Sequence, residues 1–186
     1  LDDIKASFRR FAQLVPSSGS VIVNADNAGA CSVAYGLDAF TFGLKPGAEC
    51  TAANLRQEKG RPEFDILVHG RLYAHAALQV CGQHNISNAL AAASAAYVLG
   101  VPGRAVEEGL NSFTGAGRRF EKKGTYHGAD VFDDYAHHPD ELRALLTMAR
   151  TLGYNRVICA FQPHTYTRTA ALFDDFVEVL KLADMA

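Results

Sequence analysis

Apolar positions in the first part of the chain follow two spacings, one typical of helices and one typical of strands. Four apolar residues share one face of a predicted N-terminal helix: Ile4, Phe8, Phe11 and Val15. An apolar run over 21–23 then predicts a buried strand, residues 28–35 predict a helix, and residues 40–42 predict a second strand. This succession of strands and helices indicates an α/β protein.

Between residues 50 and 80 the apolar runs become short and alternate with polar residues. The runs Phe64–Val68 and Leu72–Ala76 predict a β-hairpin, because the two-residue turn His69-Gly70 joins them. We therefore expect a small antiparallel sheet in this part of the chain.

Two helices and a flexible segment follow the predicted hairpin. The Ala-rich residues 85–99 predict a long helix, and residues 104–110 predict a shorter one. The segment 114–117, Thr-Gly-Ala-Gly, lacks core-forming side chains and is the best candidate for a linker. We therefore expect two domains, one over 1–115 and one over 116–186.

The pattern beyond the linker predicts a parallel unit. Residues 120–126 and 129–133 form a predicted hairpin, and Pro139 suits the first turn of an amphipathic helix. Residues 156–161 predict the next strand, and residues 172–180 predict the helix after it. Strand, helix, strand and helix in this order make a right-handed βαβ unit, so we expect part of a Rossmann-like domain.

Polar loops follow two of these strands. Residues 133–139, Asp-Asp-Tyr-Ala-His-His-Pro, come after one apolar run, and residues 162–168 come after the next. Ligands of open α/β sheets bind at the carboxyl ends of the strands, which meet at one edge. We therefore expect four side chains to face one another across one crevice: Asp134, His137, His164 and Arg168.

A third polar group begins the long Ala-rich helix. Asn85 and Asn88 lie three residues apart and therefore share a helix face, with His84 directly before them. Amide side chains at a helix start can read the donor and acceptor edge of a base, or they can cap the helix. Taken alone, capping is the favoured alternative by roughly two to one.

The composition excludes some classes of function but does not identify the function. The chain has 186 residues, of which 48% are hydrophobic and 20% charged, and its net charge is -2. These values are typical of a globular protein and exclude a generic nucleic-acid or membrane binder. The four cysteines are scattered without a C-x-x-C motif, so we expect buried, reduced thiols in a cytoplasmic protein.

Four motifs carry a resemblance to a known family. They are Gly-x-His-Asn-x-x-Asn at Gly82–Asn88, Gly-x-x-Arg-Arg-Phe at Gly115–Phe120, Asp-Asp-Tyr-Ala-His-His-Pro at Asp133–Pro139, and Phe-Gln-Pro-His-x-Tyr-Thr-Arg-Thr at Phe161–Thr169. In this order and spacing they resemble the Mur ligase family, and the similarity extends over essentially the whole chain.

The resemblance implies an ATP-dependent amide-bond ligase of peptidoglycan synthesis. Such a ligase uses ATP and Mg²⁺ to phosphorylate the lactyl carboxylate of UDP-N-acetylmuramate, and L-alanine then attacks the acyl phosphate. The resemblance also implies that 1–115 is the later part of a central ATP-binding domain. It implies that 116–186 is the first part of a C-terminal ligand domain.

The resemblance assigns roles to particular residues. Six match the nucleotide side of the family's site: His84, Asn85, Asn88, Arg119, Asp134 and His137. Arg119 matches the arginine that reaches ATP from the interdomain linker, and Asp134 matches the aspartate that contacts the ribose. His164 and Arg168 match the catalytic group near the acyl phosphate and the amino-acid carboxylate, for which arginine offers a bidentate fork.

Several features depart from the family's pattern. The chain has no G-x-x-x-x-G-K-[ST] phosphate loop, and the expected magnesium ligands lie upstream of Leu1. Thr165 stands where many relatives carry a second arginine. The opening without Met and the abrupt end lead us to expect a piece of a longer protein that is inactive alone. Its unpartnered apolar faces are expected to favour a homo-oligomer.

Other interpretations remain for individual residues. Asp133 is expected to be a structural hydrogen-bond acceptor and Asp134 the functional carboxylate, since adjacent strand residues point to opposite faces. Arg118 is either an exposed charge or part of an interdomain ion pair, and His138 is either a helix cap or exposed. We predict no metal site among the histidines, because their spacing to carboxylates matches no known ligand pattern.

Two other functions remain open. The first is a sister ligase of the same superfamily, such as a murein-peptide-recycling or folylpolyglutamate-type enzyme. The second is a non-catalytic nucleotide-binding module. The stretch Phe161–Thr169 favours the L-alanine-adding ligase over the recycling relative.

Overall fold

The chain forms two compact units in a computed structural model that describes residues 2–58 and 60–186. The first unit contains the residues up to 79 together with 83–113, and the second contains 80–82 and 114–186. The α/β class expected from the sequence is confirmed, because both units combine helices with strands.

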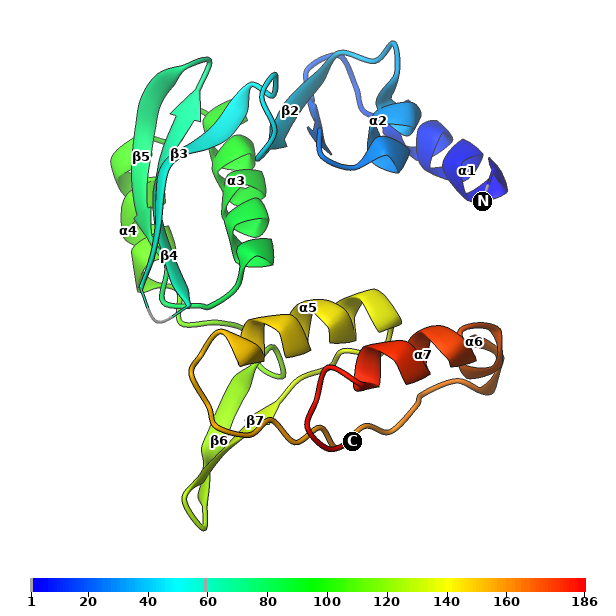
Figure 1. Cartoon of the computed structure of the whole chain (residues 1–186). Coiled ribbons are helices and arrows are strands. Elements are labelled where there is room, and N and C mark those ends of the chain that lie inside the picture. Colours follow the sequence, from blue (N-terminus) through cyan, green and yellow to red (C-terminus); the bar gives the residue numbers. More distant parts are fainter. Residues whose placement is uncertain (1, 59) are drawn as a thin grey trace. The chain divides into compact units, whose positions relative to one another are not determined.

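The first unit is built on a mixed sheet of five strands (Figure 1). The strands, in their order across the sheet, are β1 (Val21–Asn24), β2 (Ala39–Gly43), β3 (Cys50–Glu58), β4 (Arg61–Val68) and β5 (Arg71–Ala77). The first three are parallel to one another, and β4 and β5 continue the sheet in antiparallel pairing. The hairpin predicted over 64–76 is therefore confirmed.

Four helices accompany this sheet: α1 (Asp2–Ala12), α2 (Ala28–Ala34), α3 (Gln83–Val98) and α4 (Gly103–Ser112). The buried face of α3 is made mostly of small residues, so this helix lies close against the sheet (Figure 1). Phe64, Ile66 and Leu90 are fully buried and form the centre of this core.

The predicted N-terminal helix is present as α1, but its apolar face is not buried. Phe8 is 59% exposed and Phe11 71% exposed. The helix contacts α2 through its polar side instead, because Arg9 Nη1 donates hydrogen bonds to the carbonyl oxygens of Val33 and Tyr35 at 2.9 and 2.7 Å. The predicted amphipathic helix is therefore confirmed, and its apolar face is exposed.

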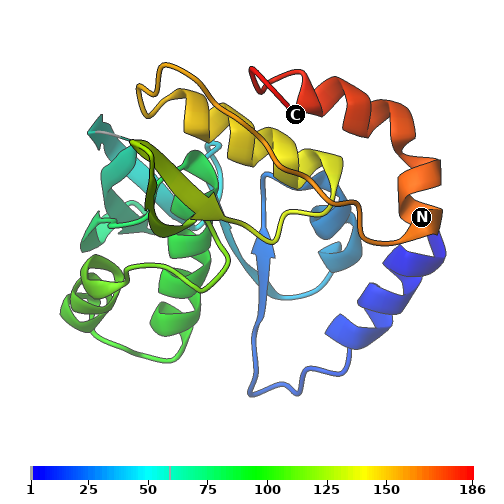
Figure 2. The same cartoon turned by 90° about the horizontal axis from the view of Figure 1, so that it is seen from below.

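The second unit consists of a hairpin and three helices: β6 (Glu121–Tyr126), β7 (Ala129–Asp133), α5 (Pro139–Arg150), α6 (Tyr166–Ala171) and α7 (Phe173–Leu180). α5 and α7 lie side by side, and Leu142, Phe176 and Val179 form the buried cluster of this unit (Figures 1 and 2). The hairpin predicted to turn at His127-Gly128 is confirmed.

The strand predicted over 156–161 is not formed. Figure 2 shows this segment as an extended coil, and Ile158 makes one isolated parallel bridge to Met185. β7 pairs with β6, so the expected parallel unit does not close between β7 and this segment. A strand needs a partner along its whole length, and here the pairing is limited to the few residues around Ile158.

The cysteines are thiols, but they do not share one environment. Cys50 is fully buried, and burial raises the pKa of its thiol. Cys81 and Cys159 are partly buried and Cys31 is exposed, so the expectation that all four are buried is wrong. No helix in the described part of the chain is both long enough and apolar enough to cross a membrane.

Candidate functional site

One polar group lies where β1 and β2 of the first unit end. Asn24 Nδ2 donates to Ser87 Oγ at 3.4 Å, which links the end of β1 to the start of α3. The carboxylate of Asp26 accepts hydrogen bonds from Leu44 N and Lys45 N at 2.6 and 3.0 Å. These residues were not singled out from the sequence, although an Asn-Ala-Asp-Asn stretch after a buried strand is a usable signal.

The three residues predicted at the start of α3 do contact one another. Asn88 Nδ2 donates to Asn85 Oδ1 at 3.1 Å, and Asn85 Nδ2 lies 3.2 Å from His84 Nε2. Because an amide nitrogen only donates, Nε2 of His84 accepts this hydrogen bond, and the neutral ring carries its proton on Nδ1. His84, Asn85 and Asn88 thus form a hydrogen-bonded row that presents amide donors and acceptors from one side of α3.

In the second unit, the carboxylate of Asp134 is held by backbone amides. Its Oδ2 accepts from Phe120 N at 2.8 Å and its Oδ1 accepts from Ala136 N at 2.7 Å. Asp133 instead pairs with Arg118, at 3.3 Å between Oδ2 and Nε. Asp134 therefore has the structural hydrogen bonds that were expected of Asp133.

Arg118 forms its contacts within the second unit. Besides the ion pair with Asp133, its guanidinium lies over the ring of Tyr135, 4.7 Å from the ring centre. This geometry is that of a cation–π contact. Arg118 is thus an exposed charge, as one of the two alternatives had it, and its ion pair lies within the second unit.

His137 and His138 have different roles at the start of α5. His138 is the N-cap, because its Nδ1 accepts from Asp140 N at 3.3 Å, as one of its two expected roles required. His137 Nδ1 lies 2.8 Å from the Tyr135 carbonyl oxygen, so this nitrogen carries a proton and donates to that oxygen.

Glu141 accepts backbone hydrogen bonds at the start of α5 and is affected by positive charges there. Burial would raise its pKa, but hydrogen bonds from the backbone N–H groups of His137 and His138 and the charges of His137 and Arg119 lower it. Glu141 therefore stays ionised and forms a capping box with the residues before the helix.

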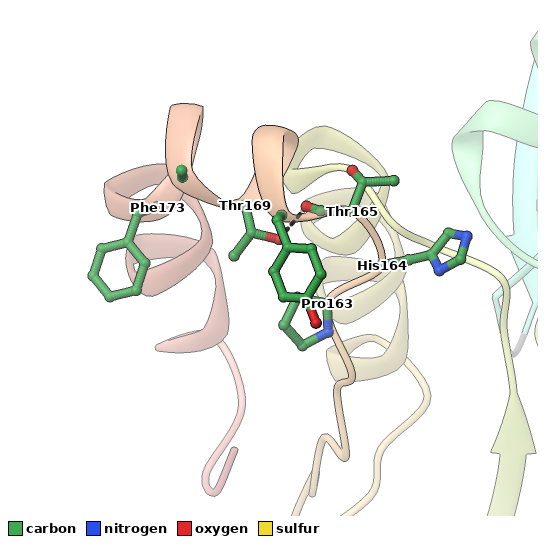
Figure 3. Close-up of a pocket in the computed structure, with 7 residues that line it drawn as sticks. Pro163, His164, Thr165, Thr169 and Phe173 are labelled. Atoms are coloured by element: carbon green, nitrogen blue, oxygen red, sulfur yellow. Dashed lines mark hydrogen bonds between the residues drawn. The ribbon is translucent and has the colours of Figure 1, made fainter.

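The loop after residue 161 lines an open pocket of about 870 Å³ (Figure 3). Its lining residues are Pro163, His164, Thr165, Tyr166, Thr169, Ala170 and Phe173. His164 and Phe173 lie at opposite ends of this group, and His164 is exposed. Arg168, the other predicted catalytic residue, lies on α6 and is partly buried.

Thr165 has an unusual backbone in this loop. Its φ is +142°, in the region that favours glycine, although it is β-branched. Its carbonyl oxygen accepts hydrogen bonds from Thr169 N and Thr169 Oγ1 at 3.0 and 2.8 Å, and these bonds help to hold the first turn of α6.

The two polar loops of the second unit pack at their bases against one buried cluster. Ala136 and Phe161, at the bases of the two loops, both pack against the cluster of Leu142, Phe176 and Val179. Within the described residues, no hydrogen bond or ion pair joins 133–138 to 162–168. The expected facing of these loops across one sheet edge depended on the strand over 156–161, which is not formed.

No metal site is apparent in residues 2–58 and 60–186. No group of three or more His, Cys, Asp or Glu side chains there could hold a metal ion. The described residues therefore do not fit a Mg²⁺ site.

Each unit matches a domain of one class of protein, the Mur ligases. Residues 1–96 match the Mur ligase middle domain, and residues 118–186 match the Mur ligase, glutamate ligase domain. The chain belongs to the Mur ligase family.

Individual curated proteins are also similar to almost the whole chain. The UDP-N-acetylmuramate–L-alanine ligase of Clostridium novyi is 45% identical over 186 residues, covering 99% of this chain and 40% of the relative. The chain thus spans well under half the length of the curated relatives it matches.

Solved structures support the same fold. The crystal structure of UDP-N-acetylmuramate-alanine ligase MurC from Thermotoga maritima matches with a TM-score of 0.76 and 28% identity, over 97% of this chain and 39% of that one. A murein peptide ligase from Psychrobacter arcticus matches with a TM-score of 0.67 and 23% identity, over 98% of this chain and 39% of that one, and shares the fold.

Proposed function

We propose that this chain is part of a UDP-N-acetylmuramate–L-alanine ligase. In this reaction ATP phosphorylates the carboxylate of UDP-N-acetylmuramate, the amine of L-alanine attacks the acyl phosphate, and ADP and phosphate leave. The observation that carries the proposal is 45% identity to such a ligase over 99% of the chain, which includes both units. Residues 1–115 would belong to the ATP-binding domain and 116–186 to the C-terminal ligand domain.

Six polar residues would bind the nucleotide. His84, Asn85 and Asn88 form a hydrogen-bonded row of the kind that can read the edge of adenine. Arg119 supplies a positive charge for the phosphates, and Asp134 and His137 supply acceptors for ribose hydroxyls. Phosphoryl transfer depends mainly on positioning and charge neutralisation, so these residue types suit the reaction.

The reacting end of the substrates would lie near His164 and Arg168. The Arg168 guanidinium can hold the L-alanine carboxylate as a bidentate fork, and His164 can donate a hydrogen bond to the acyl phosphate. Mg²⁺, held by residues outside this chain, would offset phosphate charge when bound. We also propose a cytoplasmic location, because scattered thiols without disulfides are typical of a reducing compartment.

An acceptor comparison with the whole gene product tests the proposal. We expect ADP release that requires UDP-N-acetylmuramate and is faster with L-alanine than with L-serine or glycine. A preference for a murein tripeptide over L-alanine would support the recycling ligase instead. Nucleotide binding without any ADP release would support the non-catalytic module. We expect the 186-residue chain alone to be inactive.

A further inference from the structure

The turn before β6 has a strained backbone at two positions. Arg118 has a φ of +57° and Phe120 a φ of +47°, and neither is glycine. Left-handed conformations are rare for large side chains and persist where surrounding contacts determine them. Arg119 lies between these two residues and is exposed.

Three consecutive residues at the end of β7, Asp133 to Tyr135, hold this turn. Asp134 Oδ2 accepts from Phe120 N at 2.8 Å, and Tyr135 N donates to the Arg118 carbonyl oxygen at 2.9 Å. Asp133 adds the ion pair with the Arg118 side chain. Each of the two left-handed residues is therefore fixed through its backbone.

Asp134 and Phe120 are both fixed to other parts of the second unit. The second oxygen of Asp134 accepts from Ala136 N at 2.7 Å, and Ala136 packs against the buried cluster of α5 and α7. The Phe120 ring stacks on Phe132 of β7, with ring centres 4.2 Å apart. The turn is thus tied to the core of the second unit from two sides.

We propose that Asp134 is a positioning residue that holds the 118–120 turn in its left-handed conformation and thereby directs Arg119. This proposal rests on the proposed function for what Arg119 binds, but the hold itself is independent of any ligand. Asp134 then acts on the nucleotide through Arg119 as well as through any contact of its own with the ribose.

Hydrogen exchange tests the hold in the chain without nucleotide. We expect the Phe120 amide to be protected in the wild type. Asp134→Asn replaces one acceptor oxygen by an NH₂ group that can only donate, and its remaining neutral oxygen accepts more weakly than a carboxylate, so the hydrogen bonds of both Phe120 N–H and Ala136 N–H weaken or break. We expect exchange at Phe120 and Tyr135 to become faster by roughly tenfold or more.

A matched pair of second substitutions distinguishes positioning from simple destabilisation. Glycine adopts positive φ without steric cost, whereas alanine does not, and both remove the Phe120 ring. We therefore expect Asp134→Asn/Phe120→Gly to melt at a higher temperature than Asp134→Asn/Phe120→Ala. We expect the same order for the affinity of the whole gene product for ATP.

The analogue 2′,3′-dideoxy-ATP lacks the ribose hydroxyls that Asp134 could contact. Its binding therefore reports the effect of Asp134 on Arg119 without a direct contact of Asp134 with the ribose. We expect Asp134→Asn to weaken binding of this analogue too, because the displaced Arg119 no longer meets the phosphates. An analogue affinity that Asp134→Asn leaves unchanged, unchanged exchange at Phe120, or equal melting of the two double variants would each overturn the proposal. If the wild type itself binds no nucleotide, the proposed function and the directing of Arg119 fail, while exchange and melting still decide the hold.

Discussion

His75 lies between two carboxylates on the β4–β5 hairpin. Its Nδ1 lies 2.8 Å from Asp65 Oδ1 and its Nε2 lies 3.4 Å from Glu63 Oε1, while its backbone N–H donates to Glu107 of α4. The hydrogen bond to Asp65 raises the pKa of His75 against the effect of burial, and the charges of Asp65, Glu63 and Glu107 add to it. The same hydrogen bond, with one from Asn54, lowers the pKa of Asp65.

These shifts predict how the stability of the first unit depends on pH. The contribution of His75 is complete below its unfolded pKa of about 6.5 and is lost as pH rises through its raised folded pKa. We therefore expect the melting temperature to fall between neutral and mildly alkaline pH, and His75→Asn to flatten this part of the profile. His127→Asn, at an exposed turn of the second unit, is the control. An unchanged slope in His75→Asn would contradict the assignment.

Two glycines of α4 have opposite surroundings. A Cβ on Gly103 would lie 1.7 Å from the Tyr73 carbonyl oxygen, whereas a Cβ on Gly109 would meet nothing within 4 Å. We expect Gly103→Ala to lower the free energy of unfolding by about 2 kcal/mol or more, because backbone must shift. Gly109→Ala should raise it by about 1 kcal/mol. Urea unfolding measures both, and equal effects would show that α4 does not pack against β5 in this way.

The start of α5 depends on an ionised Glu141. Glu141→Gln removes the charge that accepts hydrogen bonds from the residues before the helix, and we expect a loss of about 1 kcal/mol in the free energy of unfolding. Because the pKa of Glu141 is lowered, the wild type should lose the same contribution only as pH falls through that lowered pKa. Arg143→Gln, at an exposed position of α5, is the control. Chemical denaturation that fails to separate the two variants would count against the capping box.

The hairpins were predictable because their turns are local. Both turn through His-Gly, and both residues of each turn have positive φ, which suits a two-residue connection between twisted strands. The segment 156–161 has an equally apolar sequence but no local signal for its partner. Strand pairing over a long sequence separation cannot be read from the apolar pattern alone. The crevice expected between Asp134 and His164 stays a prediction.

The contacts of the motif residues were predictable where both partners lie close together in the sequence. The row of His84, Asn85 and Asn88 follows from helical spacing and could be anticipated. The hydrogen bond from Phe120 N to Asp134 joins residues 14 positions apart and depends on a strained turn. No sequence pattern predicted it. Family resemblance assigned a role to each residue without revealing the contacts between them.

The exposed face of α1 affects the behaviour of the molecule in solution. Phe8 and Phe11 of α1 are 59% and 71% exposed, and Leu14, just beyond the helix, is 77% exposed. Clustered apolar side chains of this kind favour association, so we expect the chain to self-associate as its concentration rises. Sedimentation should show this, and Phe8→Ser/Phe11→Ser should reduce it. Leu72→Ser, at an exposed position of β5, is the control, and a wild-type chain that remains monomeric would refute the prediction.

The central claim is that this chain belongs to an enzyme that joins L-alanine to UDP-N-acetylmuramate. The most direct test is incorporation of radiolabelled L-alanine into UDP-N-acetylmuramate by the whole gene product with ATP and Mg²⁺. We predict one equivalent of ADP per equivalent of product, with no incorporation when ATP or the UDP-linked sugar is omitted. Incorporation that proceeds without ATP, or ADP release that never yields the L-alanine product, would contradict the account.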